Sequence, residues 1–179
     1  MSLVGWWPLD GDVNNNIGSQ SSYEVGNVQY SAGKIGQAYD NTSGNNTGIE
    51  LLRHNDFIPY ESYYSFSLWF KSTSTNGGGG ERIISRDASE YPTIVIRQNE
   101  SSPQDLRFYK ATENNTTSVS VNEWHHLAFT IDVERNKSQL FIDGDLVGTG
   151  GYNGDTSERP YVLGGNTEGD GDISGNHFK

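Results

Sequence analysis

Residues 64–71 read Tyr-Ser-Phe-Ser-Leu-Trp-Phe-Lys, and this stretch decides the class of fold. Phe66, Leu68 and Phe70 fall on one side of an extended chain, and the two serines fall on the other. A two-residue alternation of apolar and polar positions is typical of a β-strand that is buried on one face. Trp69 breaks the alternation because it falls on the polar face. The stretch therefore predicts a half-buried strand that carries one exposed indole.

Short runs of the same kind recur along the chain, separated by Gly, Asn, Ser and Asp. Asp143-Gly144, between the apolar runs 140–142 and 145–147, favours a type I′ hairpin because both turn residues need a positive φ. No stretch of a dozen residues shows a helical repeat. The sequence thus predicts an all-β chain folded as an antiparallel two-sheet β-sandwich. Further strands are expected at 82–86, 93–98, 105–110, 118–121, 124–131, 138–143 and 160–163.

Length and composition narrow the class of protein. The 179 residues suit a single domain, 1–179, in which 1–3 are read as native or as an expression remnant. Twelve Lys and Arg against 23 Asp and Glu give a net charge of −11, which argues against nucleic acid as a partner. No run approaches the ~20 apolar residues of a membrane span. The absence of Cys excludes disulfides.

Three parts of the sequence, in order, resemble one family. The first joins 3–12 (Leu-Val-Gly-Trp-Trp-Pro-Leu-Asp-Gly-Asp) to 33–40, and the second is the strand 66–71. The third joins 121–130 (Val-Asn-Glu-Trp-His-His-Leu-Ala-Phe-Thr) to 140–148. Together they are similar to the laminin-G-like jelly rolls of the concanavalin A-like lectin/glucanase superfamily. The resemblance implies a concanavalin A-like jelly roll over nearly the whole chain.

This interpretation assigns structural roles to three tryptophans and to two glycines. Trp6 and Trp7 are expected on an opening strand at Leu3–Leu9, where their area would be buried in the core. Trp124 is expected to anchor the inner face of its strand. Gly33 and Gly36 are expected to bracket a turn that needs a positive φ or a close backbone approach.

The family includes sugar binders, adhesion modules and spacers, so the resemblance implies a function only in outline. We expect a non-catalytic carbohydrate- or protein-binding module of lectin or adhesion type, contacting a glycan or a protein surface. It would be part of a larger bacterial or viral protein, in an extracellular, cell-surface or virion-associated location. The alternative is a structural or assembly module without a small ligand.

The end of the sequence departs from the family pattern. In relatives, the Phe-Lys that matches residues 178–179 is followed by one more strand. That strand returns and lies beside the first strand. Here that strand is absent, supplied by another chain, or lost by truncation, and truncation is the first of these explanations. An unpaired edge on the opening strand would permit a homodimer through that edge.

The acidic turns predict calcium. Residues 170–175, Asp-Gly-Asp-Ile-Ser-Gly, follow the alternating oxygen pattern of calcium loops and have Gly at the sixth place. Asp10 and Asp12 offer a second set of oxygens, and the family resemblance allows the two sets to lie close together or to share one ion. Asp- and Gly-rich turns also occur without metal. The candidate metal ligands are Asp10, Asp12, Asp170, Asp172 and Ser174.

Carbohydrate contact needs exposed aromatic rings beside polar groups. Trp69 lies on a polar strand face, Tyr91 lies in the loop before Pro92, and Tyr152 lies among glycines. These three are the candidate ligand-binding residues, although Tyr is often half exposed without a function.

A glycoside hydrolase is the less favoured alternative, because it needs two carboxylates held on one strand face. The pairs at these spacings all fall in turns or between glycines: Asp132/Glu134, Asp143/Asp145 and Glu168/Asp170/Asp172. His125 and His126 are read as a hydrogen-bonded core histidine beside an exposed one, rather than as metal ligands. Six Asn-x-Ser/Thr triplets are expected to be unused: Asn41, Asn45, Asn99, Asn114, Asn115 and Asn136.

Overall fold

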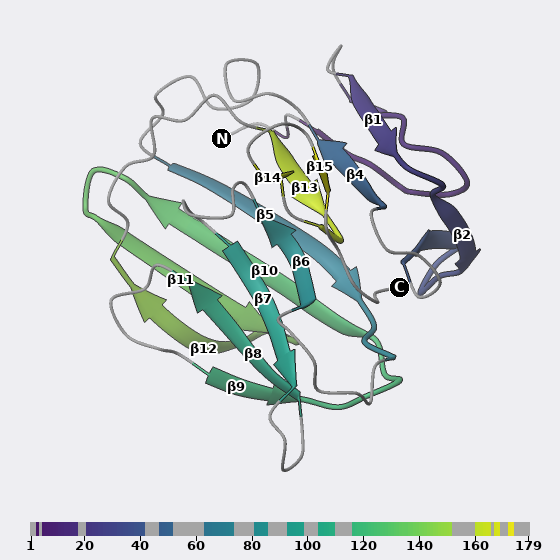
Figure 1. The fold of residues 1–179 in the computed structure, drawn as a ribbon. Coiled ribbons are helices and arrows are strands. Elements are labelled where there is room, and N and C mark those ends of the chain that lie inside the picture. The colour runs from purple at the N-terminus through teal and green to yellow at the C-terminus, as the bar shows by residue number, and fades with distance from the viewer. Residues whose placement is uncertain are drawn as a thin grey trace.

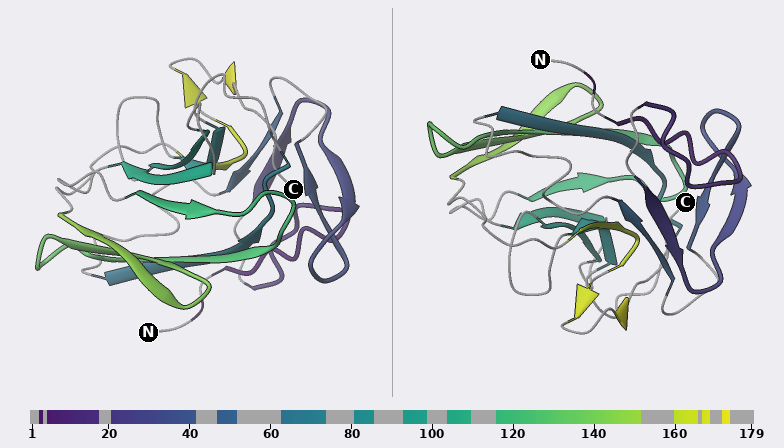
Figure 2. Two further views of the ribbon diagram at one scale, coloured as in Figure 1. Left: turned by 90° about the horizontal axis from the view of Figure 1, so that it is seen from below. Right: turned by 90° about the horizontal axis from the view of Figure 1, so that it is seen from above.

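Two antiparallel sheets lie face to face in the computed structural model (Figures 1 and 2). The four-stranded sheet has the order β12 (Asp145–Gly150), β11 (Lys137–Ile142), β10 (His125–Asp132) and β5 (Tyr63–Phe70). The structure describes residues 3, 5–17, 21–41, 47–51, 63–73, 81–85, 93–98, 104–109, 116–151, 160–165, 167–168 and 172–173.

The second sheet has seven strands and covers the inner face of the first (Figure 2). Its order is β1 (Ser22–Val25), β4 (Gly48–Leu51), β13 (Tyr161–Leu163), β6 (Glu81–Ser85), β7 (Thr93–Gln98), β8 (Gln104–Tyr109) and β9 (Thr116–Val119). Two hairpins complete the strands that are described: β2 (Gln29–Ala32) with β3 (Gln37–Asp40), and β14 (Thr167–Glu168) with β15 (Asp172–Ile173). The all-β sandwich predicted from the alternation is confirmed.

The core lies between the two sheets and is built by the apolar side of the predicted alternation. Phe129 of β10 is fully buried and lies opposite Phe66 of β5, with which it stacks at 5.1 Å between ring centroids. Phe66 also meets Tyr161 of β13 at 4.7 Å, so aromatic contacts cross from one sheet to the other. Rings of this size supply much of the buried area that a thin two-sheet core requires.

The hairpin between β11 and β12 has the geometry expected from its sequence. Asp143 has φ 52° and Gly144 has φ 93°, so both central residues are in the left-handed region. This is the requirement of a type I′ turn, whose twist matches that of the strands it joins. The Asp143 N–H also donates to the His126 carbonyl at 2.8 Å, which holds the turn against β10.

The opening segment differs from the prediction. Residues 3 and 5–9 are described without strand structure, so the expected strand at Leu3–Leu9 is wrong in this part of the chain. The segment folds back locally instead: the Trp6 N–H donates to the Asn15 side chain, and the Trp6 carbonyl accepts from the Asn16 N–H. Trp6 is exposed, against the prediction, whereas Trp7 packs against the core.

A buried polar network fixes the chain just after β13. Asn41 donates to the Gly164 carbonyl at 2.7 Å and accepts from the Thr47 hydroxyl at 2.6 Å, and Tyr39 donates in turn to Thr47 at 3.3 Å. Burial raises the pKa of Tyr39 to about 12, against the opposite effect of the Thr47 hydrogen bond. Because Asn41 is 0% exposed, the Asn-x-Ser triplet that begins there is inaccessible to glycosylation in the folded chain.

Candidate functional site

Trp69 is the one predicted ligand-binding residue that lies within the described part of the chain; Tyr91 and Tyr152 lie outside it. It stands on the outer face of the four-stranded sheet and is 45% exposed. Its neighbours in the alternation, Phe66 and Leu68, are on the inner side and pack against the core. The exposed indole predicted from the sequence is confirmed.

Two basic groups surround the Trp69 ring. The Lys34 ammonium lies over it at 4.8 Å from the ring centroid. The imidazole of His126, which is the cross-strand partner of Trp69 on β10, lies at 5.1 Å with the two planes tilted by 57°. A cation over an indole face is attracted by the ring quadrupole. The ring is therefore held between neighbours from two different parts of the chain.

Lys34 reaches the ring because the turn between β2 and β3 is held in place. The Gly33 N–H donates to the Gly36 carbonyl at 2.9 Å, and the N–H of Gln37 donates to the Asp10 carboxylate at 2.7 Å. Gly36 has φ 59°, which confirms the expected positive φ. A Cβ at Gly36 would meet the Asp10 carboxylate at 2.7 Å. The local geometry thus favours glycine at this position for two separate reasons.

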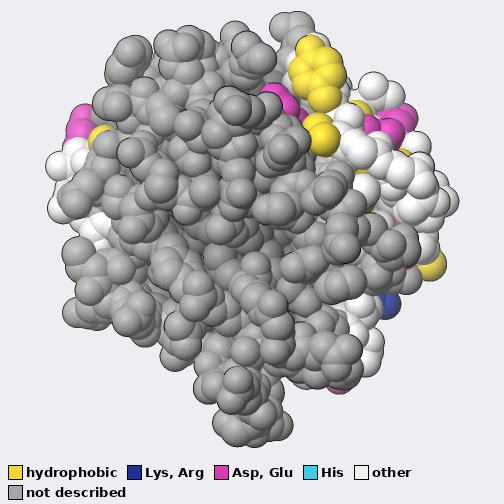
Figure 3. Space-filling view, in the orientation of Figure 1, with side chains coloured by type: hydrophobic (Ala, Val, Ile, Leu, Met, Phe, Trp, Pro, Cys, Tyr) yellow, Lys and Arg dark blue, Asp and Glu magenta, His cyan; other side chains and the backbone are white. Residues whose placement is uncertain are grey.

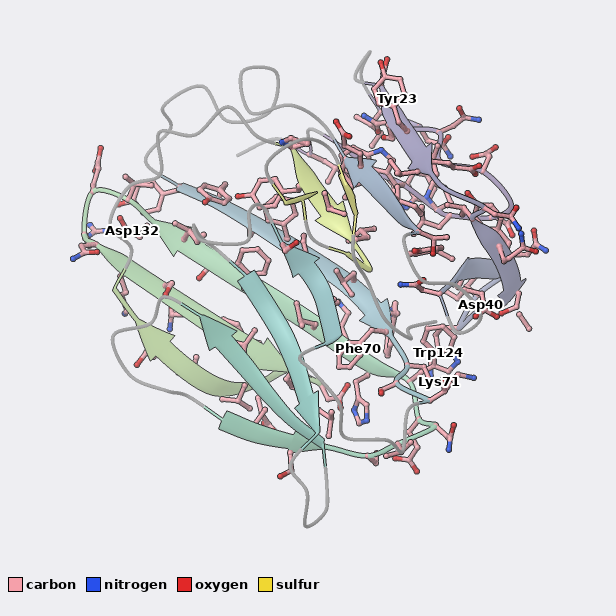
Figure 4. All side chains as sticks on the ribbon, in the orientation of Figure 1. Tyr23, Asp40, Phe70, Lys71, Trp124 and Asp132 are labelled. Carbon is pink, nitrogen blue, oxygen red and sulfur yellow. The ribbon has the colours of Figure 1, made fainter. Side chains whose placement is uncertain are left out.

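A second indole–ammonium pair lies beyond the end of β5. The Lys71 ammonium is 5.3 Å from the centroid of the Trp124 ring, and Figure 4 shows these two residues together. Trp124 is not part of the buried core, so its expected role as an inner-face anchor is wrong. The reason is the strand alternation: Leu127 is fully buried, so even-numbered positions of β10 and its approach face outward.

The other end of β5 carries a third aromatic group with a cation. Tyr63, 37% exposed, accepts a hydrogen bond from the Arg135 guanidinium at 2.6 Å. Arg135 also pairs with Asp132 at 3.0 Å, and its backbone N–H donates to the same carboxylate. Loss of hydration acts to raise the pKa of Asp132, but the hydrogen bonds from Arg135 outweigh it and hold that pKa below its ordinary value.

His125 links two turns at the edge of this face. Its Nδ1 lies 2.7 Å from the Asp143 carboxylate, and its Nε2 lies 3.0 Å from the Ser120 hydroxyl. This order of groups resembles that of a serine nucleophile with its base. However, the Ser120 hydroxyl donates its single proton to Glu123, so the histidine receives no proton from it. The arrangement joins the turn before β10 to the β11–β12 hairpin.

The Asp143 carboxylate is also engaged by the backbone, because its second oxygen accepts from the His126 N–H at 2.8 Å. Partial loss of hydration acts to raise the pKa of Asp143, but the hydrogen bonds from His125 and from the His126 N–H hold it below the ordinary value. Neither Asp132 nor Asp143 is therefore held as a protonated acid, which is what the first step of glycoside hydrolysis requires.

The predicted calcium ligands are only partly described. Asp10 accepts from the Gln37 N–H, and Asp12 accepts from the Asn14 N–H at 2.9 Å, so each carboxylate stabilises a turn. Asp170 and Ser174 lie outside the described residues, and Asp172 is placed in β15 by its backbone alone. Within the described ranges no three His, Asp or Glu side chains form a group that could hold a metal. The calcium site stays a prediction.

Comparison with protein families identifies the class. Residues 43–177 match a laminin-G family model described as the concanavalin A-like lectin/glucanases superfamily. Since the match covers more than half of the sequence, the chain belongs to this family. The matched range begins after the opening segment, which is also the segment whose predicted strand is wrong. No curated protein matches the chain in sequence.

Solved structures share the fold at low sequence identity. Domain 4 of AbnA, an extracellular GH43 arabinanase from Geobacillus stearothermophilus in complex with arabinotriose, has a TM-score of 0.59 at 20% identity, over 94% of this chain and 84% of that one. The receptor-binding domain of the botulinum neurotoxin C/D mosaic serotype has a TM-score of 0.62 at 16% identity, over 98% of this chain and 46% of that one. The type G receptor-binding domain gives 0.59 at 12% identity, over 94% and 43%. This chain spans less than half of the toxin domains.

The described part of the chain contains no helix long and apolar enough to cross a membrane.

Proposed function

We propose that the chain is a non-catalytic carbohydrate-binding module whose contact surface is centred on Trp69. The observation that carries the proposal is an exposed indole on an ordered strand, flanked by the hydrogen-bonding side chains of Lys34 and His126. Sugar rings present an apolar face and a polar rim, which matches this combination. The arabinanase domain with the same fold was solved with arabinotriose, which agrees with a glycan ligand.

The test is glycan binding by the wild type and by Trp69→Ala, on an array and then by titration calorimetry. Truncation of a central aromatic anchor removes at least ~2 kcal/mol, so the dissociation constant should rise about thirty-fold. Trp6→Ala is the matched control, because Trp6 is 55% exposed but lies outside the sheet. Absence of binding to every glycan by the wild type would count against the proposal, as would equal loss in both variants.

A purely structural or assembly module is the second candidate, and the position of β5 favours it. Within the described strands β5 is paired on one side only, by β10. Its eight residues contain no charge and no proline, so little in them opposes pairing with another strand. Assembly of two copies through this edge would appear as a dimer in light scattering. A strict monomer at high concentration would argue against assembly through β5.

The location and the wider context of the module follow as part of the same proposal. An extracellular, cell-surface or virion-associated site agrees with a glycan partner and with the extracellular arabinanase. A role as one module of a larger surface protein agrees with the toxin domains, of which the matching region is only a part.

A further inference from the structure

We infer that the outer face of the four-stranded sheet binds the interior of a linear acidic polysaccharide, laid along β5 from Trp69 to Tyr63. This inference rests on the proposed function and names the ligand class for the same site. It depends on three features of the face: the spacing of the two aromatic rings, the small side chains between them, and the distribution of charge.

The two aromatic residues mark the ends of one straight track. Trp69 and Tyr63 are six positions apart on a single strand, so both side chains point to the same face. At ~3.4 Å per residue their α-carbons are ~20 Å apart, which is the length of several consecutive sugar rings. A cation lies over each ring: the Lys34 ammonium is 4.8 Å from the Trp69 centroid, and the Arg135 guanidinium is 5.8 Å from the Tyr63 centroid. Two fixed platforms at this separation suit a chain that continues past both, rather than a single terminal sugar.

The side chains between the Trp69 and Tyr63 rings are short, and most of them are polar. On β5 they are Ser65 and Ser67, and their cross-strand partners on β10 are Thr130 and Ala128. Because these side chains are short, the larger rings stand above them at both ends. Hydroxyl groups both donate and accept hydrogen bonds, which is the bonding that sugar hydroxyls need.

The charge on this face differs from that of the whole chain. Four basic side chains lie on or beside it: Lys34 over Trp69, Lys71 over Trp124, Arg135 on Tyr63, and Lys137 opposite Asp132 on β11. Neither Lys34 nor Lys71 has a carboxylate partner among the described residues. The carboxylate that the register places on the face, Asp132, is already paired with Arg135.

Further acidic groups lie in turns that border this face. Glu134 and Asp143 lie in the turns at the two ends of the four-stranded sheet. Figure 3 shows the opposite side of the molecule, where a few Asp and Glu side chains are visible at the margin. Asp10 accepts from the Gln37 N–H in the turn that carries Lys34, and Asp143 accepts from the His126 N–H. Lys34 and Lys71, which have no carboxylate partner among the described residues, are therefore the two cations of this face that an anion could pair with. At physiological ionic strength charges beyond ~8 Å are screened, so a bound anion responds to the nearby ammonium groups more than to the net charge.

Titration calorimetry of the whole chain with matched oligosaccharides tests the inference. The ligands are oligogalacturonides from disaccharide to octasaccharide, the same oligomers with their carboxyl groups reduced to alcohols, and sulfated dextran oligomers. We expect affinity to rise with length and then level off once both platforms are covered. We also expect the acidic oligomers to bind more tightly than the reduced ones, by a margin that shrinks as salt is added. Comparison of the sulfated dextran oligomers with the oligogalacturonides shows whether the site prefers a sulfate ester or a carboxylate.

Two variants and a control assign the effect to residues. Tyr63→Ala should abolish the rise of affinity with oligomer length and leave the affinity for short oligomers unchanged. Tyr23→Ala is the control, because Tyr23 is 59% exposed on β1 of the other sheet, and it should change neither affinity. Lys34→Gln should weaken the binding of acidic oligomers by up to about five-fold and leave the binding of reduced oligomers almost unchanged. Thermal melts of every variant verify that the fold is intact.

The outcomes separate this inference from the proposed function. Tight binding of reduced oligomers with no preference for acid groups, or affinity independent of length, overturns the inference while the carbohydrate-binding function stands. Binding of no oligosaccharide at all overturns both. A dimer that Trp69→Ala converts to a monomer also overturns the inference, because a second copy of the chain would then occupy the face.

Discussion

Two buried serines show how the surroundings of a single hydroxyl decide its effect on stability. Ser85 is fully buried and donates to the Gly165 carbonyl at 2.5 Å. Ser138 is 1% exposed on the inner face of β11, and its hydroxyl has no hydrogen-bond partner among the described residues. A buried polar group without a partner costs about 1–3 kcal/mol, whereas a paired one contributes about 1 kcal/mol.

The two serines should therefore respond to alanine with opposite signs. Ser138→Ala should leave the free energy of unfolding unchanged or raise it by up to about 1 kcal/mol, because it removes an unpaired hydroxyl. Ser85→Ala should lower it by about 1–2 kcal/mol, because the Gly165 carbonyl is left without that donor. Urea denaturation of both variants measures the difference. A loss of similar size in Ser138→Ala would contradict the assignment.

Asp143 gives the chain a pH dependence whose sign can be worked out. Its pKa is lowered in the folded state, so its contribution to stability is present above the unfolded pKa of about 4 and is lost as the pH falls through the folded pKa. The wild type should lose stability as the pH falls below about 5 and toward the lowered pKa of Asp143 in the folded state. In Asp143→Asn that loss should be smaller. Denaturation midpoints at several pH values measure both slopes, and parallel slopes would show that Asp143 does not contribute.

At the scale of elements, the turn between β2 and β3 determines whether Lys34 can reach Trp69. Gly36→Ala meets two obstacles, a positive φ and the Asp10 carboxylate. Gly144→Ala meets only the positive φ, because no described residue lies within 4 Å of its Cβ position. The left-handed conformation alone costs a side chain about 1–2 kcal/mol.

Gly36→Ala should therefore destabilise the chain more than Gly144→Ala, and it should also weaken glycan binding by moving Lys34. Denaturation gives the first comparison and calorimetry the second. Equal destabilisation would mean that Asp10 moves aside freely. Unchanged binding in Gly36→Ala would mean that Lys34 acts independently of this turn.

The elements that could be predicted from the sequence are those with a strong local pattern. The eight-residue alternation of β5 and the Asp143-Gly144 turn give that strand and that hairpin directly. β1 reads Ser-Tyr-Glu-Val and β2 reads Gln-Tyr-Ser-Ala, which are too short and polar to stand out, and pairing with distant strands or a neighbouring hairpin defines them instead. The opening segment has apolar residues like a strand, but the Trp6 N–H donates to the Asn15 side chain and the Trp6 carbonyl accepts from the Asn16 N–H, which holds the segment in a loop.

The candidate site was predictable in part for the same reason. Trp69 could be found because it violates a local alternation. Lys34 and Arg135 could not, because their places beside the sheet depend on turns whose geometry comes from long-range contacts. Tyr63 belongs to the same strand as Trp69, and its exposure follows from the same alternation. The prediction for Trp124 is wrong because it follows the size of the indole and not the alternation of Leu127, Phe129 and Ile131, which places position 124 on the outer face.

At the scale of the whole molecule, calcium remains the proposal with the simplest test. An ion that binds only the folded chain raises its stability by mass action, so millimolar calcium should raise the melting temperature above that in EDTA. Asp172→Asn should remove the calcium-dependent rise. Asp10→Asn should lower the melting temperature even in EDTA, because Asp10 also holds the Gln37 N–H. An unchanged midpoint in calcium would exclude the metal.

The hydrogen bond from Asn41 to the carbonyl of Gly164 joins positions 123 residues apart, and β4 pairs with β13 at the same place. By contrast, β10, β11 and β12 are consecutive hairpins that close over short loops. Closure of long loops is slow, because its entropic cost precedes the contacts that offset it. During synthesis on the ribosome, β1 and β4 emerge early but cannot join the rest of their sheet until residues 161–163 have left the exit tunnel. The strands made first are thus among the last to be fixed in place.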